Sequence, residues 1–131
     1  MIVEAGPVLK VRNIRKWNGK HEILKGISLE LHKGDIKCVV GPSGSGKSTL
    51  LHCINFLVQF DEGRIWMNGE EIDYYSKRAL YAFRQKVGMI FQDFNLFDHL
   101  TALRNVQIAL VRVKKMSKSE ARRRALAELE R

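Results

Sequence analysis

Eight consecutive residues have the types and the spacing of a phosphate-binding loop. They match the pattern G-x-x-x-x-G-K-[ST] and are Gly41, Pro42, Ser43, Gly44, Ser45, Gly46, Lys47 and Ser48. The glycines allow successive backbone N–H groups to turn toward one anion, and a helix that begins behind the loop directs its positive end to the same place. Lys47 would place a positive charge on the β- and γ-phosphates of a nucleotide, and the Ser48 hydroxyl would coordinate a Mg²⁺ that bridges them. Thr49 is expected on the first helical turn, near the α-phosphate.

Two flanking elements must hold this loop in position. The run Ile36–Val40 is apolar except for Lys37, which predicts a central strand covered on both faces. The segment Thr49–Leu57 has the apolar spacing of a helix that packs back on a sheet. A glycine-serine turn that matches the pattern by chance is the alternative, and the strand and helix context argues against it.

Trp17 and Gln92 are two further candidates for the site. Trp17 follows a predicted strand, Val8–Arg15, and precedes the turn signal Asn18-Gly19. It would either cover the edge of a sheet or stack on a nucleobase. Gln92 follows the apolar run Val87–Phe91, predicted as a second buried strand. Because ligands bind at the carboxyl ends of strands in open α/β sheets, Gln92 could share a pocket with Lys47; the alternative is an ordinary hydrogen-bonded loop residue.

The other predicted elements build the scaffold around these residues. Strict alternation predicts a half-buried strand over 27–32, and Asn68-Gly69 predicts a hairpin within 63–72. A short helix is expected over 76–84. Thr101 is expected to cap a second helix, and Ser117 with Glu120 forms the capping box of a third.

The composition is that of a folded protein. The chain has 131 residues, 45% of them hydrophobic and 28% charged, which allows one domain of ordinary size. No apolar run approaches the roughly 18 residues of a membrane span, and the first residues lack the pattern of a signal peptide, so we expect a cytosolic chain. Cys38 and Cys53 have no metal-binding spacing, and we expect both to be core residues in a reducing compartment.

The net charge of +9 raises the possibility of nucleic-acid binding. Eight Lys or Arg residues and only three acidic residues lie in the last twenty residues, so much of the charge is local. Such a charge run is usually a solvated face, and it is also compatible with a position near an anionic membrane surface.

Taken in order, the motifs resemble the N-terminal half of an ABC-type ATPase subunit. The resemblance covers nearly the whole chain, and the stretches that carry it are 25–29, 41–51, 88–92 and 100–106. Within the family, the stretches 52–57, 94–97 and 116–122 are most similar to polar amino-acid importers. Asp98 stands where importers often have Pro, and Arg104 where Glu is usual; both lie where the family docks its membrane partner.

The resemblance implies an α/β fold. It consists of a P-loop NTPase-type parallel sheet with an N-terminal antiparallel β portion up to about residue 92, followed by the start of a helical subdomain over 93–131. It implies ATP and Mg²⁺ as cofactors, an adenine-stacking role for Trp17, and a role for Gln92 at the Mg²⁺ or the attacking water. The implied partners are transmembrane permease subunits and a second ATP-binding subunit in a head-to-tail dimer, at the cytoplasmic face of the membrane and without nucleic acid.

The family's LSGGQ signature, acidic Walker B pair and switch histidine are not in these 131 residues. We therefore expect a chain cut short, which carries the phosphate cradle but hydrolyses no ATP alone. The alternatives are a DNA-acting ATPase of the same superfamily, which usually has coiled-coil or zinc insertions between the residues equivalent to Lys47 and Gln92, and a nucleotide-binding remnant. In the resembled fold, strands from the missing half separate 36–40 from 87–91, so both segments should expose unpaired backbone and be prone to aggregation.

Overall fold

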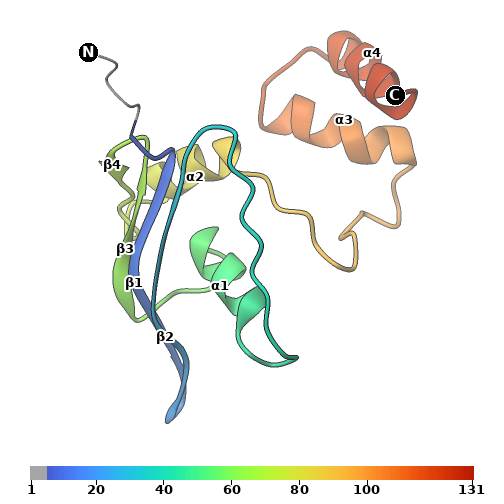
Figure 1. Ribbon diagram of the computed structural model, residues 1–131. Helices are drawn as coiled ribbons and strands as arrows, with labels where there is room; N and C mark the ends of the chain where they lie inside the picture. The colour runs from blue at the N-terminus through green and yellow to red at the C-terminus, as the bar shows by residue number, and fades with distance from the viewer. Residues whose placement is uncertain (1–5) are drawn as a thin grey trace. The chain divides into compact units, whose positions relative to one another are not determined.

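The computed structural model describes residues 6–131, which form an α/β chain of two units. The first unit extends to Gly88, and the second comprises Met89–Arg131. Figure 1 shows a sheet with helices in the first unit and two helices in the second. Each unit is described by itself below.

The first unit is built on a four-stranded antiparallel sheet in the order β2-β1-β3-β4. The strands are β1 (Leu9–Asn18), β2 (His21–Leu31), β3 (Glu62–Met67) and β4 (Glu70–Glu71). The turn predicted at Asn18-Gly19 and the hairpin predicted at Asn68-Gly69 are both confirmed, since the first lies between β1 and β2 and the second between β3 and β4. Asn68 and Gly69 have φ values of 51° and 84°, the left-handed conformation that a tight hairpin turn requires.

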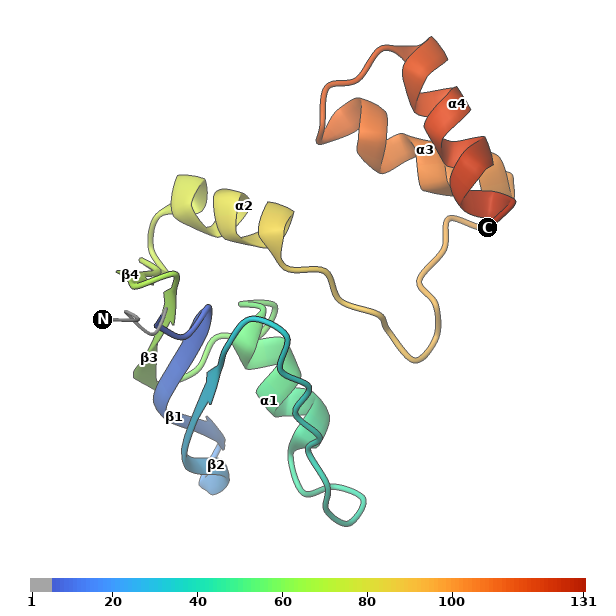
Figure 2. The same ribbon diagram turned by 45° about the horizontal axis from the view of Figure 1, so that its top comes forward.

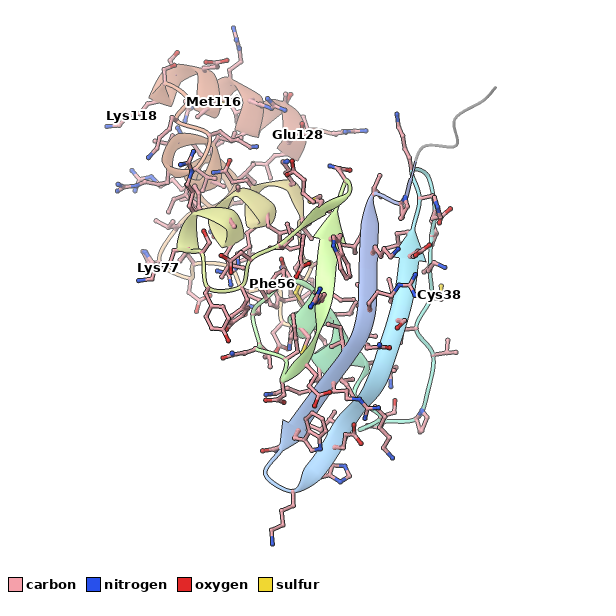
Figure 3. All side chains as sticks on the ribbon, turned by 90° about the vertical axis from the view of Figure 1, so that its left-hand side faces the viewer. Cys38, Phe56, Lys77, Met116, Lys118 and Glu128 are labelled. Atoms are coloured by element: carbon pink, nitrogen blue, oxygen red, sulfur yellow. The ribbon has the colours of Figure 1, made fainter. Side chains whose placement is uncertain are left out.

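Two helices, α1 (Lys47–Ile54) and α2 (Lys77–Lys86), pack on one face of this sheet. Ser76 caps α2 by accepting a hydrogen bond from the Ala79 N–H, which agrees with the helix predicted from residue 76. Figure 3 shows Phe56 among the side chains between the sheet and the helices. Its ring meets that of Phe83 edge to face at 5.2 Å. The buried core comprises Val11, Ile14, Leu24, Leu50, Cys53, Phe56, Ile65 and Phe83.

Two strand predictions were wrong. Residues 36–40 and 87–91 form no strand, and Ile36, Val40 and Ile90 are 91%, 89% and 96% exposed. A strand needs a neighbouring strand to pair with, and neither segment pairs with any of the four strands described in residues 6–131. The expectation that apolar side chains of these segments would be exposed holds for Ile36, Val40 and Ile90, whereas Val87 packs against the core and its N–H donates to the Phe83 carbonyl oxygen at 3.1 Å. The residues that the structure describes contain no parallel sheet. Cys38, expected in the core, is exposed, whereas Cys53 is buried as expected.

The second unit is a helical hairpin of α3 (Ala102–Arg112) and α4 (Lys118–Leu129). Both predicted caps are confirmed, because the Thr101 and Ser117 hydroxyls accept the N–H groups of Arg104 and Glu120. Ala121 and Ala125 of α4 are fully buried. Within residues 6–131, no helix has the length and apolar character needed to cross a membrane.

Candidate functional site

The N-terminus of α1 differs from those of the other helices described in residues 6–131. Side-chain oxygens of Ser76, Thr101 and Ser117 cap α2, α3 and α4, whereas Gly46 precedes α1 and supplies no side-chain cap. The first backbone hydrogen bond of α1 runs from the Leu50 N–H to the Gly46 carbonyl at 2.8 Å. Within the described chain, the N–H groups of residues 46–49 have no recorded acceptor. Four donors at the positive end of a helix can therefore bind an anion.

A side chain at Gly46 would be strained in this position. Its φ is +89°, and a Cβ atom would lie 3.0 Å from Cγ2 and 3.3 Å from the carbonyl oxygen of Ile23 in β2. The loop therefore lies close to β2, at a separation and in a conformation that favour glycine. Gly44 also has a positive φ, at +76°. The two glycines shape the turn that leaves the N–H groups at the start of α1 open.

Lys47 lies over the same loop. Its Nζ atom donates to the carbonyl oxygens of Gly41 and Pro42 at 2.9 and 2.7 Å. These two contacts keep the ammonium group beside the loop, where residues 41–45 are exposed. The Lys47 side chain thus folds back on the loop that leads into α1.

The donor set suits a nucleotide with its magnesium ion. Ser48 is exposed on the first turn of α1, where its hydroxyl can act as an oxygen ligand, and Thr49 is half-buried beside it. Four uncapped N–H groups and one ammonium match a polyphosphate, which carries several negative oxygens. The residues of the loop therefore fit a Mg²⁺-bound nucleotide.

Trp17 lies near the end of β1, in the hairpin that the loop contacts. It pairs with Glu22 of β2, and the neighbouring Ile23 is the residue that Gly46 approaches. Figures 1 and 2 both show the β1–β2 hairpin tip and the loop before α1 at the same end of the first unit. The half-buried indole is thus on the element that also positions the anion site.

Asp61 is a residue of this end of the unit that the sequence analysis missed. Its carboxylate accepts the backbone N–H of Trp17 at 2.8 Å and lies 3.2 Å from the Nζ atom of Lys16. The hydrogen bond from Trp17, with the nearby Lys16 charge, lowers the pKa of Asp61. Asp61 stands just before β3 and belongs to no sequence motif that the analysis used. Its contact with Trp17 is therefore visible only in the folded structure.

Gln92 belongs to the second unit and lies in an exposed turn after the irregular segment 87–91. It does not end a strand, so the geometric argument for placing it beside Lys47 does not hold. The structure brings together residues 41–49 and Trp17 in the first unit. The role of Gln92 stays a prediction.

The sequence matches one known protein family over most of its length. The family described as "ABC transporter" matches residues 24–131. An uncharacterized amino-acid ABC transporter ATP-binding protein, YhdZ of Escherichia coli, is 43% identical over 131 residues, covering 100% of this chain and 52% of YhdZ. The histidine/lysine/arginine/ornithine transport ATP-binding protein HisP of the same species is 44% identical, covering 92% of this chain and 51% of HisP. The chain thus spans about half the length of the curated relatives it matches.

Solved structures give the same result. The bacterial ABC transporter cassette MJ0796, solved as a dimer, is 36% identical with a TM-score of 0.80, covering 93% of this chain and 56% of that chain. A second dimeric structure of MJ0796, in a post-hydrolysis state bound to ADP and Pi, has a TM-score of 0.79.

Proposed function

Because this chain belongs to the ABC transporter family, we propose that it forms the phosphate-binding part of an ATP-binding subunit that couples ATP binding and hydrolysis to amino-acid import. The observation that carries the proposal is the uncapped start of α1, where four N–H groups and the Lys47 ammonium converge on one exposed loop. This arrangement supplies positive charge and directed donors without a competing carboxylate in the loop.

Each residue of the loop has a defined part in this proposal. The N–H groups of residues 46–49 bind phosphate oxygens, and Lys47 exchanges its two carbonyl contacts for the β- and γ-phosphates. Ser48 would hold the Mg²⁺, and the family resemblance assigns Gln92 a role at the same ion or at the attacking water. When bound, the metal ion neutralises charge on the phosphates. Trp17 stacks on the adenine, since an aromatic face binds a base with little demand on its identity.

The proposed solute is a polar amino acid, and the proposed site of action is the cytoplasmic face of the membrane. The names of YhdZ and HisP support this part, because both refer to amino-acid transport or to specific amino acids. The dimeric MJ0796 cassette supports a pair of ATP-binding subunits. From the family resemblance we propose that the pair is head-to-tail and acts on transmembrane permease subunits. Uptake of radiolabelled histidine, arginine and glutamine by cells with and without the intact gene tests the solute class. Unchanged uptake of all three would contradict it.

Equilibrium binding of ATP tests the site itself. Lys47→Ala removes the charge at the loop, and we expect ATP affinity to fall by at least tenfold, since hydrogen bonds to charged groups contribute about 1.5–3 kcal/mol. Lys37→Ala is the matched control, because Lys37 is an exposed lysine in the segment leading to the same loop. Equal affinity of the Lys47→Ala variant and the unaltered chain would overturn the proposal.

A further inference from the structure

We propose that Asp61 is a positioning residue that fixes the Trp17 indole for the base of the bound nucleotide. The inference rests on the proposed function, in which Trp17 stacks on adenine. It goes further because it assigns a role to an acidic side chain that contacts no part of the phosphate loop.

The hydrogen-bonded ladder between β1 and β3 stops before it reaches Trp17. Its last pair is Arg15 with Glu62, the first residue of β3. The Asp61 N–H still donates to the Arg15 carbonyl oxygen at 2.9 Å. Two residues further along β1, the N–H of Trp17 lies beyond the point where β3 begins. The Asp61 carboxylate accepts this N–H at 2.8 Å. The Asp61 side chain thus replaces the carbonyl that a longer β3 would have supplied.

On the other edge of β1, the pairing with β2 is irregular at the same point. Lys16 pairs with Leu24 and Trp17 with Glu22, so Ile23 is an extra residue in β2. A bulge of this kind bends a strand and weakens local pairing. Without Asp61, the end of β1 would be held by the bulged strand alone, and the direction of the indole would be less well fixed.

Lys16 adds a second contact to the same carboxylate. Its Nζ atom lies 3.2 Å from Oδ2 of Asp61, and the Lys16 and Asp61 side chains are 21% and 43% exposed. Partly exposed ion pairs contribute little to stability, so the hydrogen bond from the Trp17 N–H is the contact that fixes the position of Trp17. The ion pair with Lys16 orients the Asp61 carboxylate toward that N–H.

The same strand segment connects Trp17 to the phosphate loop. Ile23, the extra residue opposite Trp17, is also the residue that Gly46 approaches most closely. Asp61 therefore holds the indole at a fixed place relative to the start of α1. A base and a triphosphate on one nucleotide favour such a fixed separation, because one ligand of limited length must reach both sites at once.

Amide hydrogen exchange, measured without any nucleotide, tests whether the Asp61 carboxylate holds the Trp17 N–H. In Asp61→Ala the Trp17 amide should exchange at least tenfold faster than in the unaltered chain, whereas the Val11 amide inside β1 keeps its rate. Asp61→Asn keeps an oxygen acceptor and should restore slow exchange. An unchanged Trp17 rate in Asp61→Ala, or an equal increase at Val11, would overturn the inference.

Titrations with ATP and with tripolyphosphate test whether Asp61 positions the indole, with the backbone amide signals of Lys47 and Ser48 followed by NMR in every variant. Asp61→Ala should weaken ATP binding about fivefold or more and leave inorganic tripolyphosphate, which has no base, within twofold. Asp61→Asn should bind ATP as the unaltered chain does. In a Trp17→Ala background, Asp61→Ala should cause no further loss, because the two residues act as a unit.

The outcomes separate the two proposals. If Trp17→Ala binds ATP as well as the unaltered chain, the stacking role in the proposed function is wrong, and the positioning role is wrong with it. If Trp17→Ala weakens ATP binding and Asp61→Ala does not, only the positioning role is wrong. If Asp61→Ala weakens ATP and tripolyphosphate equally, Asp61 supports the fold and not the indole, and the inference also fails.

Discussion

The Nζ atom of Lys47 donates to the carbonyl oxygen of Pro42 at 2.7 Å, so the phosphate loop closes over its own lysine. Together with the contact to Gly41, this bond holds the ammonium on the loop that leads into α1. The charge is therefore prepositioned, and a polyphosphate has to displace only two carbonyl contacts to reach it. The predictions that follow depend on this geometry and on the sheet that supports it.

Gly46→Ala should abolish measurable ATP binding. A Cβ atom at φ +89° is strained and meets Ile23, which costs about 1–3 kcal/mol and pushes the start of α1 away from β2. Gly44→Ala is the matched control, because Gly44 also has a positive φ but nothing lies within 4 Å of its Cβ position. It should weaken binding less. Equal affinities of both variants would contradict the close approach of the loop to β2.

Gly63→Ala should destabilise the first unit. Its Cβ atom would lie 2.7 Å from the carbonyl oxygens of Arg12 and Asn13, and Gly63 has a φ of +113°. Because two backbone atoms cannot move aside, we expect a loss of about 2–4 kcal/mol in the free energy of unfolding. Urea denaturation measures it, with Gly69→Ala in the β3–β4 turn as a control free of clashes. A smaller loss in Gly63→Ala than in Gly69→Ala would contradict the close approach of Gly63 to the backbone of Arg12 and Asn13.

The two cysteines should differ in reactivity. Cys38 is exposed in the segment 36–40, and burial raises the pKa of the Cys53 thiol. Since the thiolate is the reactive form, a maleimide at neutral pH should label Cys38 rapidly and Cys53 only after denaturation. Mass spectrometry of the labelled chain checks this. Protection of Cys38 would mean that the segment is paired in a sheet, contrary to the structure.

The charge of Asp61 should stabilise the fold at neutral pH and not in acid. The hydrogen bond from the Trp17 N–H lowers the pKa of Asp61 below the ordinary 3.8. A depressed carboxyl pKa gives stability that is fully present above the unfolded pKa and is lost as the pH falls through the folded one. The unaltered chain should therefore be more stable than Asp61→Asn at pH 7, and the difference should vanish in acid below the folded pKa. Urea denaturation across this range measures it, and a difference independent of pH would contradict the assignment.

Local signals in the sequence were sufficient for much of the fold. Asn18-Gly19 and Asn68-Gly69 gave the hairpins, and Ser76, Thr101 and Ser117 gave the helix starts, because turns and caps depend on residues that are close in sequence. The segments 36–40 and 87–91 were predicted wrongly as strands. Apolar content shows that a segment can be buried in a sheet, but pairing depends on a neighbour that the segment itself does not encode.

The site was predictable to a similar degree. The loop from Gly41 to Ser48 follows from its pattern alone, since its chemistry depends on consecutive backbone N–H groups. Asp61 is separated from Trp17 by 44 positions and belongs to no motif. Its contact arises where β3 ends beside β1, which is a property of register and not of local sequence.

The central claim is that the open N–H groups at the start of α1 bind the phosphates. Titration with inorganic tripolyphosphate, followed by NMR of the backbone amides, tests this most directly. We predict that the amide signals of Gly46, Lys47, Ser48 and Thr49 shift together with one dissociation constant, while those of Lys77 and Arg78 at the capped start of α2 do not move. Shifts confined to the basic residues between 112 and 124, with none at 46–49, would show that the anion binds by net charge and that the account is wrong.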